Sequence, residues 1–229
     1  MDEEKLANKY TGKNAHNYDS SRKSSRKWNN EQNAVELSLT NIMYDDGIHN
    51  ILDIPVGTGR FFDIYDSLQP TPKVLGIDVS DDMLEKAKNK KKKGNHDSIQ
   101  LRQGNILENL NLQVKIDVIV CIRLFNWFSL EQIKNALGNL KKQDPEYLLI
   151  GVRTMDIGKY DWKRKTMRFI NRIPSFLRDY GGTNVHRLKK WRHLLEKNDL
   201  LVENRILVEE RISGSKYGTD YYIYTLKCV

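Results

Sequence analysis

The chain has 229 residues, of which 39% are hydrophobic, and a formal net charge of +8. This size and apolar content suit one α/β domain with a buried core. No apolar run approaches the length of a membrane span, and residues 1–5 are too polar for a signal peptide. Cys121 and Cys228 are the only cysteines and lack metal-ligand spacing, so we expect reduced thiols, no metal site and a cytoplasmic protein.

Strands and helices are expected to alternate along the first two thirds of the chain, after a polar start that is partly helical up to about residue 28. Helices are predicted at Glu31–Met43 and from Gly59, Asp81 and Leu130; strands are predicted at Asn50–Ile54, Lys73–Asp78, Ile99–Arg102, Lys115–Ile122 and Glu146–Arg153. This alternation favours a parallel sheet with crossover helices.

An insertion, residues 155–184, follows the fifth predicted strand. Trp162, Phe169 and Ile173 repeat at helical spacing among basic residues, and Pro174 is expected to end that helix. A second basic helix is predicted at Val185–Lys197. The segment Lys159–Arg192 contains eleven Lys and Arg but only two Asp, so this region carries all of the net positive charge. Two closing strands, Leu200–Val208 and Tyr221–Leu226, are expected to form an antiparallel hairpin.

A glycine-rich turn, with Gly57 and Gly59, follows the first strand and its acidic residue Asp53. The next strand ends at Asp78, which can accept hydrogen bonds from ribose hydroxyls, while the glycines let a ligand approach the backbone. Phe62 occupies the position where a dinucleotide fingerprint needs a third small residue, and no Gly-Lys-Ser/Thr is present. A ligand with adenosine but no phosphate therefore fits better than NAD, FAD or a nucleoside triphosphate.

Four motifs in order resemble those of the class I S-adenosylmethionine (SAM)-dependent methyltransferases, in particular their small-molecule methyltransferase domain. They are the turn after Asp53, with Pro55 in place of the first glycine; the strand ending at Asp78 with the helix start Asp81–Leu84; the loop Gln103–Ile106, with Asn105 for the usual Asp; and the strand Ile116–Cys121. The resemblance runs from about Lys13 to the C-terminus. It implies a Rossmann-like three-layer sandwich with a seven-stranded, mostly parallel sheet and an antiparallel last strand.

The resemblance also implies one SAM-dependent methyltransferase domain over residues 1–229, with an N-terminal helical cap at 1–45 and a helical lid at 155–184. Asp78 would bind the ribose, Met83 would cover the adenine, and Asn105 would read its amino group. Arg22 would pair with the carboxylate of SAM. The full expected cofactor-binding set is Asp53, Pro55, Gly57, Gly59, Asp78, Val79, Met83, Asn105, Ile106, Cys121 and Arg22.

The sequence assigns no residue a catalytic role, because SAM is already a strong electrophile and the enzyme mainly aligns a nucleophile and excludes water. The candidates near the methyl group are Tyr18, Arg123, Asn126, Trp127 and His186. His186 and His193 are both expected on the second basic helix, where each could serve as a general base, but we expect surface positions for both.

The expected reaction is methyl transfer to an O or N of a small molecule, with an anionic acceptor among the options because the insertion is basic. The segment after the fourth strand lacks the Asn/Asp-Pro-Pro-Tyr loop of enzymes that methylate exocyclic base amines, and no Pro-Cys marks a C5 base methyltransferase. Two alternatives stay open: an RNA methyltransferase that uses Lys159–Arg192 as its phosphate-binding surface, and a SAM-binding enzyme that does not methylate. The same basic region could contact anionic lipid. The acceptor, the acceptor atom and the oligomeric state are not predicted.

Overall fold

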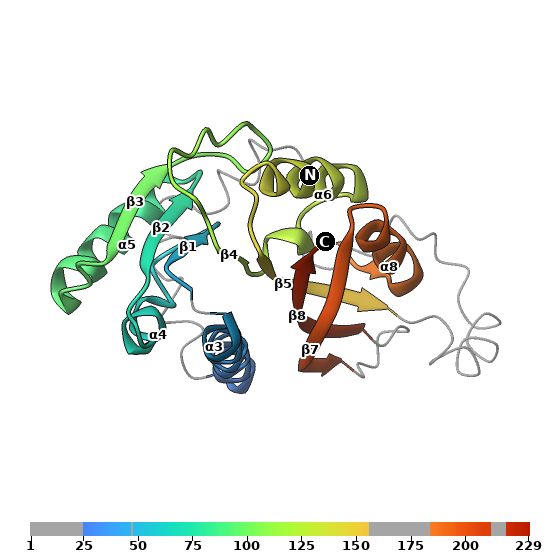
Figure 1. Cartoon of the computed structure of the whole chain (residues 1–229). Helices are drawn as coiled ribbons and strands as arrows, with labels where there is room; N and C mark the ends of the chain where they lie inside the picture. The colour runs from blue at the N-terminus through green and yellow to red at the C-terminus, as the bar shows by residue number, and fades with distance from the viewer. Residues whose placement is uncertain (1–24, 47, 156–183, 212–218) are drawn as a thin grey trace.

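A computed structural model describes residues 25–46, 48–155, 184–211 and 219–229, and within them the chain forms a mixed sheet with helices on its two faces (Figure 1). The strands are β1 (Asn50–Asp53), β2 (Lys73–Asp78), β3 (Ile99–Gln103), β4 (Val118–Cys121), β5 (Tyr147–Met155), β6 (His186–Arg187), β7 (Leu200–Arg211) and β8 (Thr219–Cys228). The main path of seven strands runs β3-β2-β1-β4-β5-β8-β7, and short β6 pairs with β5 beside it.

Strand β8 is antiparallel to its neighbours β5 and β7, whereas the other described strand pairs are parallel. The expected mostly parallel sheet with an antiparallel last strand is therefore confirmed. The chain order reverses between β1 and β4, because β1 leads to β2 on one side while β4 lies on its other side. In such sheets ligands bind beyond the carboxyl ends of the strands at this reversal.

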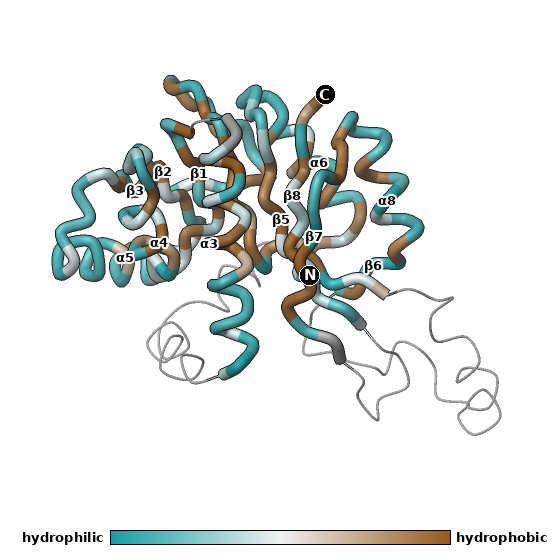
Figure 2. Tube along the Cα trace, turned by 60° about the horizontal axis from the view of Figure 1, so that its bottom comes forward, coloured by the Kyte–Doolittle hydropathy of each residue, from teal (hydrophilic) through white to brown (hydrophobic). Residues whose placement is uncertain are grey.

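Two apolar clusters fill the space between the sheet and its helices. Helices α3 (Arg26–Asp46), α4 (Phe62–Ser67) and α5 (Asp81–Gly94) share one cluster with the sheet. Helices α6 (Leu130–Lys141) and α8 (Leu188–Glu196), with the 3-10 turn η1 (Leu124–Asn126), share the other. Figure 2 shows brown, hydrophobic residues along the central strands, whereas the tube of α5 is largely teal. The expected three-layer α/β architecture is thus confirmed.

Side-chain hydrogen bonds cap the N-termini of two helices, α5 and α6. Ser80 caps α5 by accepting the Met83 backbone N–H, and Asp81 and Asp82 in the first turn suit the positive end of the helix dipole. Ser129 and Gln132 form a capping box at the start of α6. These caps hold the start of α5 directly after β2, so the segment around Asp78 has a fixed path.

The second basic helix was predicted too early in the chain. His186 and Arg187 form β6 and pair with Thr154 and Met155 of β5, and α8 begins only at Leu188. His186 is 5% exposed, which contradicts the expected surface position on a helix. Helical periodicity misled here because pairing with β5 overrides the local preference of two residues.

The other boundaries shift by a few residues. Helix α3 starts at Arg26 rather than Glu31, and α4 starts at Phe62 rather than Gly59 because Gly57 and Gly59 have positive φ. The expected hairpin is β7 with β8. Of the proposed cap, residues 1–24 lie outside the described residues, and residues 156–183 of the proposed lid lie outside them as well. No described helix combines the length and the apolar character that a membrane crossing requires.

Candidate functional site

The glycine-rich turn after β1 approaches the end of β2 through its backbone. Gly57 has a φ of +57°, and its N–H donates to Asp78 Oδ2 at 2.9 Å. A Cβ on Gly57 would meet no atom within 4 Å, so the positive φ, rather than crowding by the protein, favours glycine here. A Cβ on Gly59 would lie 2.4 Å from the Phe62 ring. Phe62 therefore fills the room that a third small residue would leave.

Asp78 joins the turn to the start of α5. Its Oδ2 accepts the Gly57 N–H and its Oδ1 accepts the Ser80 N–H, each at 2.9 Å. Burial raises the pKa of Asp78, against the opposing effect of these N–H donors. Each carboxylate oxygen has a second lone pair, so the group can accept further hydrogen bonds from a ligand while it holds the loop.

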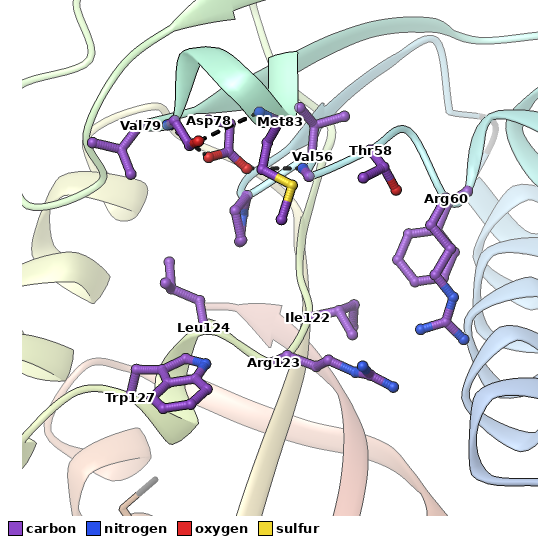
Figure 3. Close-up of a pocket in the computed structure, with 14 residues that line it drawn as sticks. Val56, Thr58, Arg60, Asp78, Val79, Met83, Ile122, Arg123, Leu124 and Trp127 are labelled. Atoms are coloured by element: carbon purple, nitrogen blue, oxygen red, sulfur yellow. Dashed lines mark hydrogen bonds between the residues drawn. The ribbon is translucent and has the colours of Figure 1, made fainter. Parts of the chain in front are cut away.

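A main pocket opens at the carboxyl ends of β1, β2 and β4 (Figure 3). It is lined by Pro55, Val56, Gly57, Thr58, Arg60, Phe61, Asp78, Val79, Ser80, Met83, Ile122, Arg123, Leu124 and Trp127. A second pocket adjoins it and shares Pro55, Asp78, Val79 and Leu124, adding Asn105, Ile106 and Phe128 among others. Asp78 therefore lies where the two pockets meet.

The expected adenine-side residues divide between the two pockets. Met83 and Val79 line the main pocket, where Figure 3 shows the Met83 side chain beside Asp78, and Asn105 and Ile106 line the adjoining one. The Asn105 side-chain oxygen accepts the Leu107 N–H at 3.0 Å and so shapes the loop as an Asx turn. Its side-chain nitrogen donates to Glu108 Oε1 at 3.4 Å.

Two arginines reach the main pocket from opposite sides, Arg60 from the turn after β1 and Arg123 from the end of β4. Glu31 of α3, which is 0% exposed, pairs with Arg60 and accepts from Arg123 Nε at 2.8 and 2.9 Å. Burial opposes ionisation of Glu31, but Arg123 and Arg60 outweigh it and hold its pKa below the ordinary value. In Figure 3 the guanidinium groups of Arg60 and Arg123 point toward α3.

The segment after β4 is held through its backbone. The Asn126 carbonyl accepts the Asn184 N–H, the Trp127 carbonyl accepts Asn184 Nδ2 at 3.1 Å, and the Phe125 carbonyl lies 3.0 Å from His186 Nε2. Burial lowers the pKa of His186, with the Phe125 carbonyl opposing it, so at neutral pH the neutral ring donates to that carbonyl. His186 thus stabilises the backbone of the segment after β4.

The Asn126 side chain does not line the main pocket. Its side-chain oxygen accepts the Arg153 N–H at 2.6 Å, and the residue is 8% exposed. Trp127, the next residue, does line the main pocket. Of the polar and aromatic residues expected in this segment, the structure therefore brings Trp127 and Arg123 to the pocket and keeps Asn126 inside the fold.

Several expected residues stand behind the pocket walls within the described part of the chain. Asp53, Gly59, Cys121, Asn126 and His186 are not among the residues that line either pocket. Asp53 is 1% exposed, and burial raises its pKa to about 8. Burial also raises the pKa of the Cys121 thiol. Tyr18 and Arg22 lie outside the described residues.

Sequence reasoning missed part of the lining. The missed residues are Val56, Thr58, Arg60, Phe61, Ser80, Ile122 and Leu124, along with Ile54, Gly104, Leu107 and Phe128 of the adjoining pocket. Most are chain neighbours of predicted residues, so widening each motif by a residue or two would have found them. Glu31 gave no such signal, because only the packing of α3 brings it to the site.

The strand order, the tight turn after β1 and the acid that ends β2 together define the class I, SAM-dependent methyltransferase fold. Residues 51–143 match the family model described as "Methyltransferase domain". A crystal structure of magnesium protoporphyrin IX methyltransferase from Synechocystis PCC 6803 with bound SAH shares the fold, with a TM-score of 0.68 and 12% identity over 99% of this chain and 100% of that one. Residues 51–143 therefore match a methyltransferase domain, and the chain as a whole shares the fold of a SAM-dependent methyltransferase.

Two curated proteins match shorter stretches. The release factor glutamine methyltransferase of Aliivibrio fischeri is 35% identical over 86 residues, which are 38% of this chain. The demethylmenaquinone methyltransferase of Lactococcus lactis subsp. lactis is 44% identical over 59 residues, 25% of this chain. The matches span only 30% and 23% of the length of these relatives.

Proposed function

We propose that the protein transfers the methyl group of SAM to an O or N of a small molecule. The observation that carries the proposal is Asp78, a buried carboxylate at the junction of two pockets whose oxygens already hold Gly57 and Ser80. An acid fixed in this way presents its remaining lone pairs at the carboxyl edge of the sheet, where an adenosine ribose would need two acceptors.

The described residues fit the three parts of SAM. Asp78 would bind the ribose hydroxyls. Val79 and Met83 supply apolar surface for the adenine, and Asn105 with Ile106 lies in the adjoining pocket. Arg123 and Arg60 are cations at the main pocket that suit the carboxylate of the amino-acid part. When bound, SAM supplies an electrophilic methyl group on a sulfonium.

The chain's own contribution to the chemistry is alignment and exclusion of water. Ile122, Leu124 and Trp127 give the main pocket an apolar wall after β4, on the side opposite Met83 in Figure 3. This wall would hold an acceptor nucleophile in line with the methyl group and reduce its hydration. His186 is committed to the Phe125 carbonyl and buried, so we do not assign it as the base.

A small acceptor is supported by two of the similar proteins. The names of the Synechocystis and Lactococcus proteins give a porphyrin and a quinone as their acceptors, while the name of the Aliivibrio protein gives a glutamine of a release factor. Within the proposal a small acceptor is preferred, because the apolar wall at Leu124 and Trp127 suits a compact molecule with apolar surface.

The experiment is a measurement of SAM binding by calorimetry, followed by SAH release with a panel of small phenols, amines, carboxylic acids and quinones, a mixed RNA and a protein extract. We expect SAM to bind and at least one small-molecule class to yield SAH. Absence of SAM binding would refute the cofactor assignment. Binding without SAH release from any acceptor would favour a SAM-binding enzyme that does not methylate.

One observation favours the RNA alternative. Arg187, Lys189, Lys190 and Arg192 are exposed around α8, while Trp191 of the same helix is buried. If these cations bind phosphates, replacing Lys189, Lys190 and Arg192 with Gln should flatten the salt dependence of RNA binding by roughly one unit of slope per lost contact. A small acceptor instead predicts unchanged turnover in the same variant.

A further inference from the structure

One fully buried carboxylate forms ion pairs with both arginines of the main pocket. It is that of Glu31, which is 0% exposed and belongs to α3, before the glycine-rich turn in the sequence. Arg123 Nη2 lies 2.6 Å from Glu31 Oε2, and Arg60 pairs with the same oxygen. Glu31 therefore fixes two guanidinium groups that arise from different strands' loops.

The charge of this cluster matches a single anionic group. Glu31 is ionised, because Arg123 and Arg60 hold its pKa low against the effect of burial. Counted over Glu31, Arg60 and Arg123 alone, the charges sum to one positive charge. A ligand carboxylate in the main pocket would be attracted to the two guanidinium groups, whose donors suit a carboxylate in forked geometry.

Both arginines are also held in place by other means. Arg60 stacks on the Trp28 ring, with its guanidinium carbon 3.6 Å from the ring centroid. Arg123 has a φ of 70°, an uncommon value for a residue other than glycine that costs free energy and recurs at functional sites. From this backbone position the Arg123 side chain reaches Glu31, which is fully buried, so the ion pair is not a solvent-exposed surface pair.

We propose that Glu31 is a positioning residue that holds Arg60 and Arg123 in the geometry required by the carboxylate in the amino-acid part of SAM and SAH. The inference rests on the proposed function, since it needs SAM in the main pocket. It makes α3 part of the cofactor site although no atom of α3 lines either pocket among the described residues.

Helix α3 has anchors besides Glu31. Lys27 pairs with Glu209 at 2.9 Å, Asn30 Nδ2 donates to the Val208 carbonyl at 3.2 Å, and Val35 and Leu39 are fully buried. A change at Glu31 should therefore leave α3 in place while it removes the carboxylate that Arg60 and Arg123 share. Without the shared anion the two guanidinium groups repel each other and lose their common orientation.

The test compares two ligands that share the adenosine part. SAH carries the amino acid with its carboxylate, and 5′-methylthioadenosine lacks it. In Glu31→Gln, calorimetry should give a dissociation constant for SAH about 10- to 100-fold higher than in the wild type, and one for methylthioadenosine within about twofold. Glu36→Gln, an exposed position on the same helix, is the matched control and should change neither.

An equal loss for both ligands would mean that Glu31 has only a structural role, and unchanged or tighter SAH binding would overturn the inference directly. If thermal unfolding shows that Glu31→Gln does not fold, Glu31→Asp keeps the charge with a shorter reach and must still weaken SAH alone. Equal weakening of both ligands there would overturn the inference as well. A wild type that binds neither ligand would refute the proposed function, and this inference would fall with it.

Discussion

Replacing Asp78 with Ala tests whether the junction of the two pockets is a ribose site. The carboxylate is 6% exposed, and each oxygen spends one lone pair on a backbone N–H at 2.9 Å. The remaining lone pairs can form charge-assisted bonds to the ribose hydroxyls, worth about 1.5–3 kcal/mol together. At 1.4 kcal/mol per tenfold, the dissociation constant of SAH should rise roughly 10- to 100-fold.

Calorimetry with SAH and with 5′-methylthioadenosine measures this directly, and both ligands should weaken by a similar factor because both contain the ribose. The Gly57 N–H loses its acceptor in the variant, but the pocket is open and water can replace the carboxylate there. Asp81→Ala, at an exposed acid of the same loop and helix start, is the control. Unchanged affinity in a folded variant, or a loss confined to SAH, would refute the ribose assignment.

Two further changes probe the turn after β1. Gly57→Val should abolish SAH binding in calorimetry and cost about 1–2 kcal/mol of stability, because the φ of +57° is unfavourable for a β-branched residue. The control is Gly138→Ala in α6, where an added Cβ has no atom within 4 Å, and this variant should bind SAH normally. Retained SAH binding in Gly57→Val would contradict the placement of the cofactor beside this turn. Asp53→Asn should be increasingly more stable than the wild type between pH 4 and 8, by about 1.4 kcal/mol per unit at most, because the native carboxyl with its pKa near 8 holds a proton that the unfolded chain has released. Urea unfolding at several pH values measures that difference, and one that does not vary with pH would contradict the raised pKa.

Much of the site followed from sequence because parallel strands bring their carboxyl ends together. Gly57 lies in the turn after β1, Asp78 ends the neighbouring strand β2, and Met83 lies in the first turn of α5, so their proximity could be predicted. Glu31 could not be predicted, since its partners Arg60 and Arg123 lie 29 and 92 positions away and only packing of α3 joins them.

His186 and Asn126 show a second limit of sequence reasoning. The segment around His186 has a helical pattern, yet its backbone pairs with β5 and its ring with a carbonyl. Asn126 stands at a position that favours ligand contact, but the Arg153 N–H needs an acceptor inside the fold and takes its side-chain oxygen. In each case a buried backbone group decides the role of a polar side chain, and such demands leave no trace in local sequence.

The hydrogen bonds that hold the loop after β4 are made to its backbone, so the course of the loop does not depend on them being made by particular side chains of the loop. Asn184 and His186 bond to the carbonyls of Asn126, Trp127 and Phe125, which every amino acid possesses. The side chain at position 127 can therefore be exchanged without loss of the bonds that hold its backbone. Acceptor preference could thus diverge by single substitutions at Trp127, while the cofactor half of the cleft stays as it is.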